Sequence, residues 1–374
     1  MLSSEITELR RLLHRHPELS CREEQTQAIL IQFLKAHTAL EIVPCGKWFY
    51  ALYRSSAAQK RPPIAFRADV DALPMDETLC LPYASENTGI AHKCGHDGHS
   101  AALAGFGCRL GMLAPDRDVY LIFQHGEEIG AGGAECSTLL EEKQIAEVYA
   151  CHNWSGFPQG QILAKADTAQ CASQGLTVRF QGSAAHASQP ENGRNPSAAL
   201  ALLALFIEAR AGHGIRKADE PLLLATIVGL EAGGRNFGMA ASAGELSVTL
   251  RAELQEDMDG LKADILAKAS ALAEEYALTV SFSDADVFPA TVCTETCVRK
   301  VLRCAESLGL SAKTLEKPFR ASEDFGYYLQ KRPGAIFYVG NGIGYPEIHT
   351  SAYDFPDSDL PVIMRMFSAL CTAK

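Results

Sequence analysis

The chain has 374 residues, of which 47% are hydrophobic and 21% charged, a composition typical of a globular enzyme with two domains. The formal net charge of −11 and the absence of a basic stripe argue against nucleic-acid binding. Twelve cysteines occur without a CxxC pair, which predicts reduced thiols in a cytoplasmic protein. The most apolar stretch, residues 198–207, is too short to cross a bilayer, and residues 1–5 do not resemble a signal peptide. We therefore expect no membrane partner.

The first part of the chain alternates between helical and extended patterns. Residues 4–37 carry apolar side chains at helical spacing, interrupted at Pro17, which predicts two helices joined by a turn. A buried strand is expected over 64–70. The same alternation predicts helices over 100–113 and 136–143 and strands over 119–124 and 148–152. Strands that alternate with helices indicate an α/β layer.

Polar residues stand where these strands end. Asp69 lies at the end of the first strand, and His152 at the end of the third. Glu127 and Glu128 follow the second. Because functional sites in α/β sheets collect at the carboxyl ends of the strands, we expect these side chains to lie close together.

The pattern changes near residue 173. Strands are expected over 176–180, 222–228, 246–252 and 278–282, and helices over 196–209 and 258–276. This β-α-β-β-α-β order is a complete ferredoxin-like unit whose ends lie close together, as an inserted domain requires. We therefore expect a discontinuous first domain, 1–172 and 284–374, interrupted by a second domain, 173–283. The first domain resumes with a helix over 295–308, a strand over 335–339 and a helix over 358–371.

Residues 92–99 read His-Lys-Cys-Gly-His-Asp-Gly-His. Core packing gives no reason to place three histidines, a cysteine and an aspartate within eight residues. Thiolate, imidazole and carboxylate groups are the ligands of zinc-like ions. The segment therefore predicts a metal site.

Adjacent Glu127 and Glu128 point in different directions, so one can bind metal while the other takes a proton from water. The alternative for this pair is a solvated strand end. His152 could instead be a satisfied core histidine, and His349, in a Gly/Pro-rich segment, an exposed and inert one. His14 and His16 look like ordinary polar positions before Pro17, and we assign them no chemistry.

Five candidate ligands are too many for one tetrahedral zinc ion: Cys94, His96, Glu128, His152 and His349. They suit two ions that share one bridging ligand. The chain has no G-x-S-x-G elbow, which disfavours a serine hydrolase. It also has no G-x-G-x-x-G fingerprint or P-loop, which disfavours nucleotide chemistry.

These motifs resemble the dinuclear zinc aminoacylase–carboxypeptidase family. The similarity is to its amidohydrolase branch, which contains hippurate hydrolases, N-acyl-amino-acid amidohydrolases and auxin-conjugate (indole-acetyl-amino-acid) hydrolases. The matching segments run the length of the chain: 13–19 (LHRHPEL), 67–74 (RADVDALP), 92–99, 123–128 (FQxxEE), 132–134 (GGA), 182–190 (GxxxHAxxP), 323–325 (EDF) and 349–350 (HT).

The resemblance implies a zinc-peptidase-like α/β catalytic domain, with helices on both faces of a mixed sheet. It also implies an inserted ferredoxin-like lid through which subunits form a homodimer. Two divalent ions per subunit (zinc, manganese, cobalt or nickel) would be bridged by Cys94, and the other four ligands would complete the two sites. Glu127 would be the general base. Arg67 occupies the place where relatives carry a metal-binding histidine, and His96 supplies that imidazole.

The sequence departs from the family pattern at three places. His125-Gly126 replaces the usual Pro-Ala before the glutamate pair, and we read His125 as a packed or exposed histidine rather than a functional one. Residues 238–241, Gly-Met-Ala-Ala, replace Asn-Val-Ile-Pro, whose asparagine holds the substrate in relatives. Asn236 is the candidate substitute. The segment 153–157 is also unusual.

We therefore expect a metal-dependent amidohydrolase that cleaves small N-acyl (N-acetyl or N-aroyl) amino acids or related amines by a metal-bound hydroxide. Glu127 would pass the water proton to the leaving amine. His186 of the lid would donate to the oxyanion. Arg251, on a lid strand, is a candidate for binding a substrate carboxylate, although it could equally be a solvated arginine. The alternatives are a dipeptidase or carboxypeptidase of the same family, and a non-catalytic metal-binding dimer.

Overall fold

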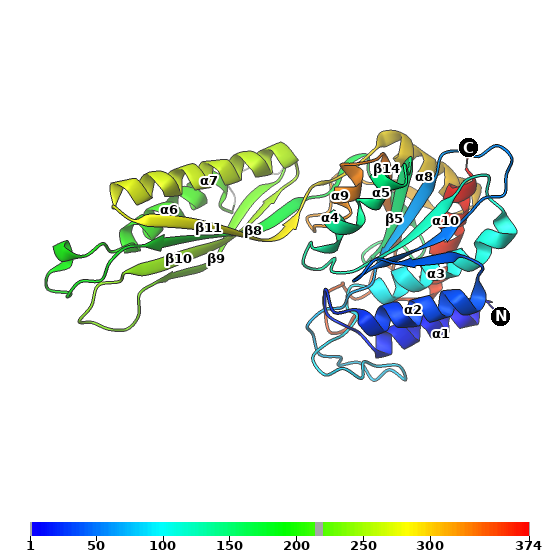
Figure 1. Ribbon diagram of the computed structural model, residues 1–374, viewed down its shortest axis with the longest axis horizontal. Coiled ribbons are helices and arrows are strands. Elements are labelled where there is room, and N and C mark those ends of the chain that lie inside the picture. The colour runs from blue at the N-terminus through cyan, green and yellow to red at the C-terminus, as the bar shows by residue number, and fades with distance from the viewer. Residues whose placement is uncertain (1, 214–219, 374) are drawn as a thin grey trace. The chain divides into compact units, whose positions relative to one another are not determined.

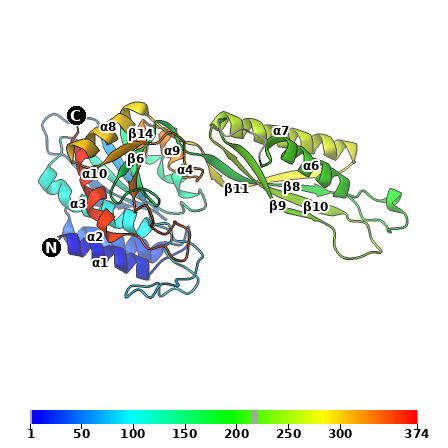
Figure 2. The same ribbon diagram turned by 180° about the vertical axis from the view of Figure 1, so that it is seen from behind.

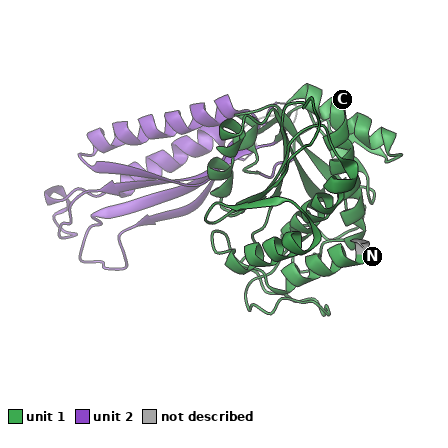
Figure 3. Cartoon of the chain, turned by 45° about the vertical axis from the view of Figure 1, so that its right-hand side comes forward, with its two compact units in different colours: residues 1–169, 291–318, 323–374 green, residues 170–290, 319–322 purple. Residues whose placement is uncertain are grey.

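The computed structural model describes residues 2–213 and 220–373 (Figure 1). The chain divides into two compact units (Figure 3). The first comprises Met1–Ala169, Thr291–Pro318 and Glu323–Lys374, and the second comprises Gln170–Ala290 and Phe319–Ser322. The expected inserted domain, 173–283, lies within the second unit.

The first unit is built on an eight-stranded mixed sheet with the order β1-β2-β4-β3-β5-β14-β6-β13. Its strands are β1 Glu41–Pro44, β2 Phe49–Tyr53, β3 Ile64–Asp69, β4 Val119–Gln124, β5 Glu147–Trp154, β6 Ile162–Ala164, β13 Ala312–Thr314 and β14 Gly334–Gly340. The central strands β4, β3, β5 and β14 run parallel to one another. Two further strands, β7 Asp167–Gln170 and β12 Thr291–Cys293, pair separately.

Helices cover both faces of this sheet, since every residue of β3, β4 and β14 is buried. They are α1 Leu2–Arg15, α2 Glu24–His37, α3 His96–Leu113, α4 Gly132–Cys136, α5 Leu139–Glu142, α8 Glu295–Ser307, α9 Gly326–Leu329 and α10 Leu360–Thr372, with a 3₁₀ turn at Asp357–Asp359. The core forms where Phe66 of β3 packs against Phe106 of α3 and Phe367 of α10, at ring distances of 4.9 and 5.1 Å.

The second unit is a four-stranded antiparallel sheet with the order β11-β8-β10-β9. Its elements are β8 Ala172–Gln181, a 3₁₀ turn Pro190–Asn192, α6 Ser197–Ala211, β9 Leu223–Ala232, β10 Ala243–Ala252, α7 Gln255–Glu275 and β11 Thr279–Phe288. Both helices lie on one face of the sheet (Figure 2). Burial alternates along β10 because only that face is covered. The expected ferredoxin-like order is confirmed.

The predicted single helix over 136–143 is wrong. Two short helices, α4 and α5, stand there instead, separated by Ser137 and Thr138. The hydroxyl of Thr138 donates to the carbonyl oxygen of Glu135 at 2.7 Å, a local bond that competes with helix continuation. Helix α3 also begins earlier than expected, at His96. Among the described residues, no helix combines the length and apolarity that a membrane-spanning segment needs.

Candidate metal centre

Three adjacent parallel strands, β4, β3 and β5, deliver polar side chains to one edge of the sheet. Asp69 ends β3, Glu127 follows β4 by three residues, and His152 lies near the end of β5. Cys94 and His96 enter the same region at the start of α3. Gly95 between them has φ +108°, and a Cβ there would lie 2.3 Å from Oδ1 of Asn153. Only glycine lets this segment approach the strand so closely.

The structure brings all five expected ligands together. Cys94, His96 and His152 form one group of donor atoms within 4.8 Å of one another. Cys94, Glu128 and His349 form a second group within the same limit. The Cys94 Sγ lies 3.4 Å from His152 Nε2, and His349 Nε2 lies 3.5 Å from Glu128 Oε1. Because Cys94 belongs to both groups, the arrangement suits two ions with a shared thiolate.

Buried polar atoms aim into this cluster without a partner. Among the described residues, His96 Nε2 and Glu128 Oε1 are buried and accept or donate no hydrogen bond. Leaving such an atom unsatisfied costs about 1–3 kcal/mol. The other ring nitrogen of His96 faces Asp71, 2.9 Å from its carbonyl oxygen, and that of His152 faces the carbonyl oxygen of Asn153 at 2.8 Å. Such bonds behind an imidazole direct its free nitrogen toward a metal, so the residues fit divalent cations.

Glu127 lies beside the ligands and is 5% exposed. Its Oε2 is 3.9 Å from His96 Nε2. Burial raises the pKa of Glu127 well above its usual value, and the neighbouring carboxylates of Glu323 and Glu128 raise it further. A buried carboxylate with a raised pKa is a suitable proton acceptor once positive charge is present nearby.

Arg67 is not part of the ligand groups. It is 1% exposed and lies behind them, with Nη1 2.7 Å from Asp69 and Nη2 2.7 Å from Asp324 and 3.1 Å from Glu323. Asp69 in turn bonds His99, with Oδ1 2.7 Å from Nδ1. The guanidinium therefore neutralises a layer of buried acids. Composition and spacing gave no sign of this role.

The expectation that His14 is an ordinary polar position is wrong. His14 is fully buried, with Nδ1 2.8 Å from Asp97 and Nε2 2.9 Å from Glu77. Burial alone would lower its pKa, but the carboxylates of Asp97 and Glu77 raise the pKa of His14 to about 9. Helix α1 is thereby tied to the residue that follows His96. Residues 13–19 belong to the motifs that carry the family resemblance, and this motif was the signal in the sequence that could have pointed to His14.

The candidate residues of the second unit fall into two places. His186 is exposed, and its loop pairs with the segment that contains Asn236: Ala187 N donates to Gly238 O at 3.0 Å. Arg251 lies near the other end of the sheet, where it pairs with Ser173 and donates to the carbonyl oxygen of Arg320. Strand β8 runs eight residue steps from Ser173, beside Arg251, to Gln181, where the chain enters the His186 loop, and these steps span about 27 Å.

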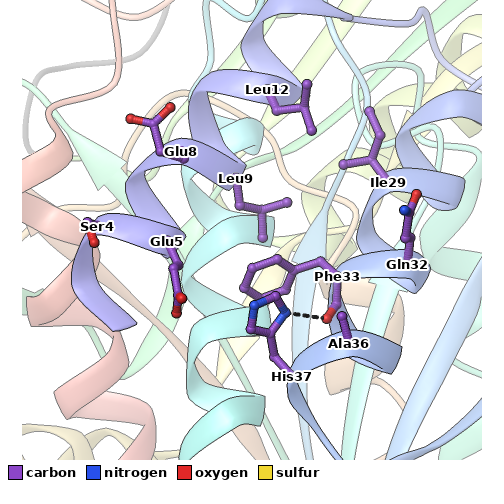
Figure 4. A pocket seen from close by; sticks show the side chains of 10 residues that line it. All are labelled: Ser4, Glu5, Glu8, Leu9, Leu12, Ile29, Gln32, Phe33, Ala36 and His37. Atoms are coloured by element: carbon purple, nitrogen blue, oxygen red, sulfur yellow. Dashed lines mark hydrogen bonds between the residues drawn. The ribbon is translucent and has the colours of Figure 1, made fainter. Parts of the chain in front are cut away.

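Two other features of the first unit are His125, which is close to the site in the sequence, and a hollow between two helices. His125 is buried rather than exposed, with ring contacts to Cys21 and Glu135. A hollow of about 470 Å³ lies between α1 and α2 (Figure 4), and its lining is mostly apolar. None of the residues that line it is a candidate ligand, so the hollow is not part of the metal centre.

The chain matches the family model of Peptidase family M20/M25/M40 over residues 65–373. It belongs to this family. The family expected from the sequence motifs is therefore confirmed.

Relatives of this M20 chain include deacetylases. It is 28% identical over 347 residues to N-acetyl-L-cysteine deacetylase of Bacillus subtilis (strain 168), and the aligned region covers 91% of this chain and 81% of the relative. It is 26% identical over 386 residues to N-acetyldiaminopimelate deacetylase of Shouchella clausii (strain KSM-K16), with coverage of 100% and 99%.

Solved structures show the same fold. The Bacillus subtilis YXEP protein, described as a dinuclear metal binding peptidase from the M20 family, matches with a TM-score of 0.81 at 24% identity, covering 99% of this chain and 98% of that one. The aminobenzoyl-glutamate utilization protein of Klebsiella pneumoniae matches with a TM-score of 0.74 at 18% identity, covering 99% and 96%. The expected two-part α/β fold is confirmed.

Proposed function

We propose that this M20 protein is a metal-dependent amidohydrolase that removes the acyl group, in the first place acetyl, from small N-acyl amino acids. One observation carries the proposal: five ligand side chains converge in two groups that share Cys94, with the buried Glu127 beside them. The relatives named as deacetylases of N-acetyl-L-cysteine and N-acetyldiaminopimelate support the acetyl group and an amino-acid product.

Cys94, His96, Glu128, His152 and His349 would hold two divalent ions. The ions supply Lewis acidity, which polarises the substrate carbonyl and lowers the pKa of water. A ligand set of thiolate, imidazole and carboxylate suits zinc, manganese, cobalt or nickel. Glu127 accepts the proton of the attacking water and delivers it to the leaving amine.

His186 would donate a hydrogen bond to the developing oxyanion. Its Nδ1 accepts the backbone N–H of Ser188 at 3.2 Å. A neutral imidazole that accepts at Nδ1 carries its proton on Nε2. The Ser188 hydroxyl also lies 2.7 Å from Nδ1. Both contacts are made by Nδ1 and leave Nε2, which is the donor to the oxyanion when it carries the proton.

His186 and Arg251 cannot both contact one small substrate from the same second unit, because about 27 Å of β8 lies between their positions. If both serve the reaction, they come from different subunits. Asn236 belongs with His186 on this account, since its Oδ1 orders the neighbouring turn by accepting Gly238 N at 3.1 Å.

A homodimer would provide the second subunit. Strand β9 is an edge of the four-stranded sheet. Val228 and Leu230 on it are 66% and 51% exposed, and Leu205 of α6 is 67% exposed. Edge strands with exposed apolar side chains are sites of strand pairing between chains. We propose that two copies associate through β9 and α6.

The function is tested by incubating the protein, with added zinc, manganese or cobalt, with N-acetyl amino acids, N-aroyl amino acids and dipeptides, and measuring the released amines by mass spectrometry. Hydrolysis of N-acetyl amino acids is expected. Faster cleavage of dipeptides would favour the peptidase alternative. Metal uptake without release of any amine would favour a non-catalytic metal-binding protein. Glu8→Gln, a change at an exposed carboxylate, is the matched control for changes at Glu127.

A further inference from the structure

Cys21 and two residues of the segment 125–135 form a row of contacting side chains in the first unit, and one of them, His125, stands two positions before the proposed base in the sequence. Cys21 Sγ lies 3.5 Å from His125 Nδ1, and His125 Nε2 lies 3.1 Å from Glu135 Oε2. The other oxygen of Glu135 accepts the indole N–H of Trp48 at 3.1 Å, which fixes the carboxylate. His125 is 2% exposed, whereas Cys21 is partly exposed. Nothing in the proposed hydrolysis uses Cys21 or Glu135.

This row of side chains has the order nucleophile, base, orienting acid. The Glu135 carboxylate can only accept, so Nε2 of His125 carries a proton, and in the neutral imidazole Nδ1 then presents a lone pair to the Cys21 thiol. The two ring nitrogens point in opposite directions. Cys21 and Glu135 therefore contact opposite edges of the ring, and the three groups cannot bind one metal ion.

Cys21 has the features of a thiol that needs a base. Burial raises the pKa of Cys21, so the resting group is the neutral thiol, and a thiol reacts as its thiolate. His125 can take the proton when the sulfur attacks. Cys21 also has φ +65°, a left-handed conformation that is rare for residues other than glycine, asparagine and aspartate and is retained where surrounding contacts hold it.

We propose that Cys21, His125 and Glu135 form a modification site for small disulfides. His125 removes the thiol proton, and Cys21 Sγ attacks one sulfur of the disulfide. A bond forms between Cys21 Sγ and that sulfur while the disulfide's own S–S bond breaks. The departing half leaves as a thiolate and takes the proton from His125. Cys21 is thus oxidised to a mixed disulfide, and half of the small disulfide is reduced to a free thiol.

The adduct would form against the loop that carries Glu127. One oxygen of Glu23 accepts both the backbone N–H of Cys21 and that of Gly126, each at 2.8 Å. A Cβ on Gly126 would lie only 3.0 Å from Cys21 Sγ. A group attached to Cys21 therefore crowds the residue next to Glu127, and we expect hydrolysis to fall. This consequence rests on the proposed function, but formation of the adduct does not.

The adduct is tested on the metal-loaded protein with 2-hydroxyethyl disulfide at pH 7, followed by peptide mass mapping over time. Exposed Cys80 is the internal comparison. Cys21 is expected to react at least about tenfold faster than Cys80, because removing an acting general base costs about 10²–10⁴-fold. His125→Gln should slow Cys21 by about tenfold or more without changing Cys80. Glu135→Gln should slow the reaction of Cys21 less than His125→Gln does. Because Glu135 is half-exposed, this variant tests the proposal even if the change at buried His125 disturbs folding. Equal rates at Cys21 and Cys80, or no effect of either variant, would overturn the proposal.

The effect on hydrolysis is read separately. Fully modified protein should lose at least about tenfold in turnover of an N-acetyl amino acid and recover it with a thiol reductant. Cys21→Ser should keep the basal turnover and lose the sensitivity. An adduct at Cys21 that leaves turnover unchanged would overturn the coupling to the Glu127 loop. If the protein hydrolyses no amide at all, the proposed function fails, while the mass measurement still decides whether the thiol site exists.

Discussion

Replacing Arg67 tests whether the acids behind the metal centre are ionised and held by this one guanidinium. Arg67 lies within 2.7–3.1 Å of Asp69, Asp324 and Glu323, all at most 1% exposed. Although burial lowers it, the charges of Glu323, Asp69 and Asp324 raise the pKa of Arg67 above its usual value, so the group stays charged. Removing one partner of a buried ion pair costs about 3–5 kcal/mol because the other charge is left uncompensated. Arg67→Met should therefore lower the free energy of unfolding of the first unit by at least that amount.

The assay is urea unfolding followed by tryptophan fluorescence with a chelator present, so that metal binding does not contribute. Both tryptophans, Trp48 and Trp154, lie in the first unit and report on it alone. The free energy of unfolding of Arg67→Lys should lie between those of the wild type and Arg67→Met, since lysine keeps the charge but not the contacts through two guanidinium nitrogens. Arg54→Met, at an exposed pair with Glu41, should leave the midpoint nearly unchanged.

Burial raises the pKa of Asp324 to about 8 even beside Arg67, whereas the pKa of Asp69 is lowered well below its usual value because its burial is outweighed by the charges of His96, His99 and Arg67. Adding Asp69→Asn to Arg67→Met should therefore recover part of the loss, because it removes one unpaired charge. If Arg67→Met alone costs less than about 1 kcal/mol, the size of an exposed pair, the acids are neutral and the reasoning fails.

Four further predictions concern the centre and its surroundings. Glu127→Gln should keep its metal but lose about 10²–10⁴-fold in turnover. Glu128→Gln should lose metal, as elemental analysis would show. Near-normal turnover of Glu127→Gln would contradict the assignment of Glu127 as the base. Cys94 should resist alkylation in the metal-loaded protein and react after chelation, so equal labelling in both states counts against ligation. His186→Ala should lower turnover by about 10²-fold at unchanged metal content. Mixing His186→Ala subunits with Glu127→Gln subunits should restore activity only if the histidine acts across subunits. If heterodimers are shown to form and activity does not return, action across subunits is excluded. The fourth prediction concerns His14, whose pKa of about 9 in the folded protein exceeds its pKa of about 6.5 in the unfolded chain. The stabilisation that protonated His14 provides is therefore complete below pH 6.5 and is lost as the pH rises through 9. If the free energy of unfolding changes equally with pH in the wild type and in His14→Gln over this range, the assignment is refuted.

The elements that the sequence predicted well are those whose signal is local. Strand 119–124 is a continuous apolar run bounded by polar residues, and the structure gives the same limits. The five candidate ligands could be named because Cys94 and His96 share one short segment and the others stand at strand ends or in family motifs. Short strands such as β6 and β13, of three residues each, were missed because so few residues show no periodicity.

The contacts that were missed join residues far apart in the chain. His14 meets Asp97 across 83 positions, and Cys21 meets His125 across 104. Nothing in the segment of one member points to the other, so periodicity and spacing carry no information about the pair. The strand that carries Arg67 was expected to be buried, but the partners of the guanidinium could not be foreseen, because only the fold brings Glu323 and Asp324 next to it.

Asp71 connects ligands that come from separate segments of the chain. Its carbonyl oxygen is 2.9 Å from His96 Nδ1, its Oδ2 accepts the backbone N–H of Glu128 at 3.0 Å, and the same oxygen accepts the Ser20 hydroxyl at 2.7 Å. One buried residue just after β3 thus orients a ligand on α3, a ligand after β4, and the segment that leads to Cys21. These bonds leave the free ring nitrogen of His96 and the carboxylate of Glu128 available to a cation, and they fix the orientation of both ligands. Through Asp71, two hydrogen bonds connect Ser20, the neighbour of Cys21, to Glu128, and this is the path by which the proposed modification of Cys21 would affect the centre.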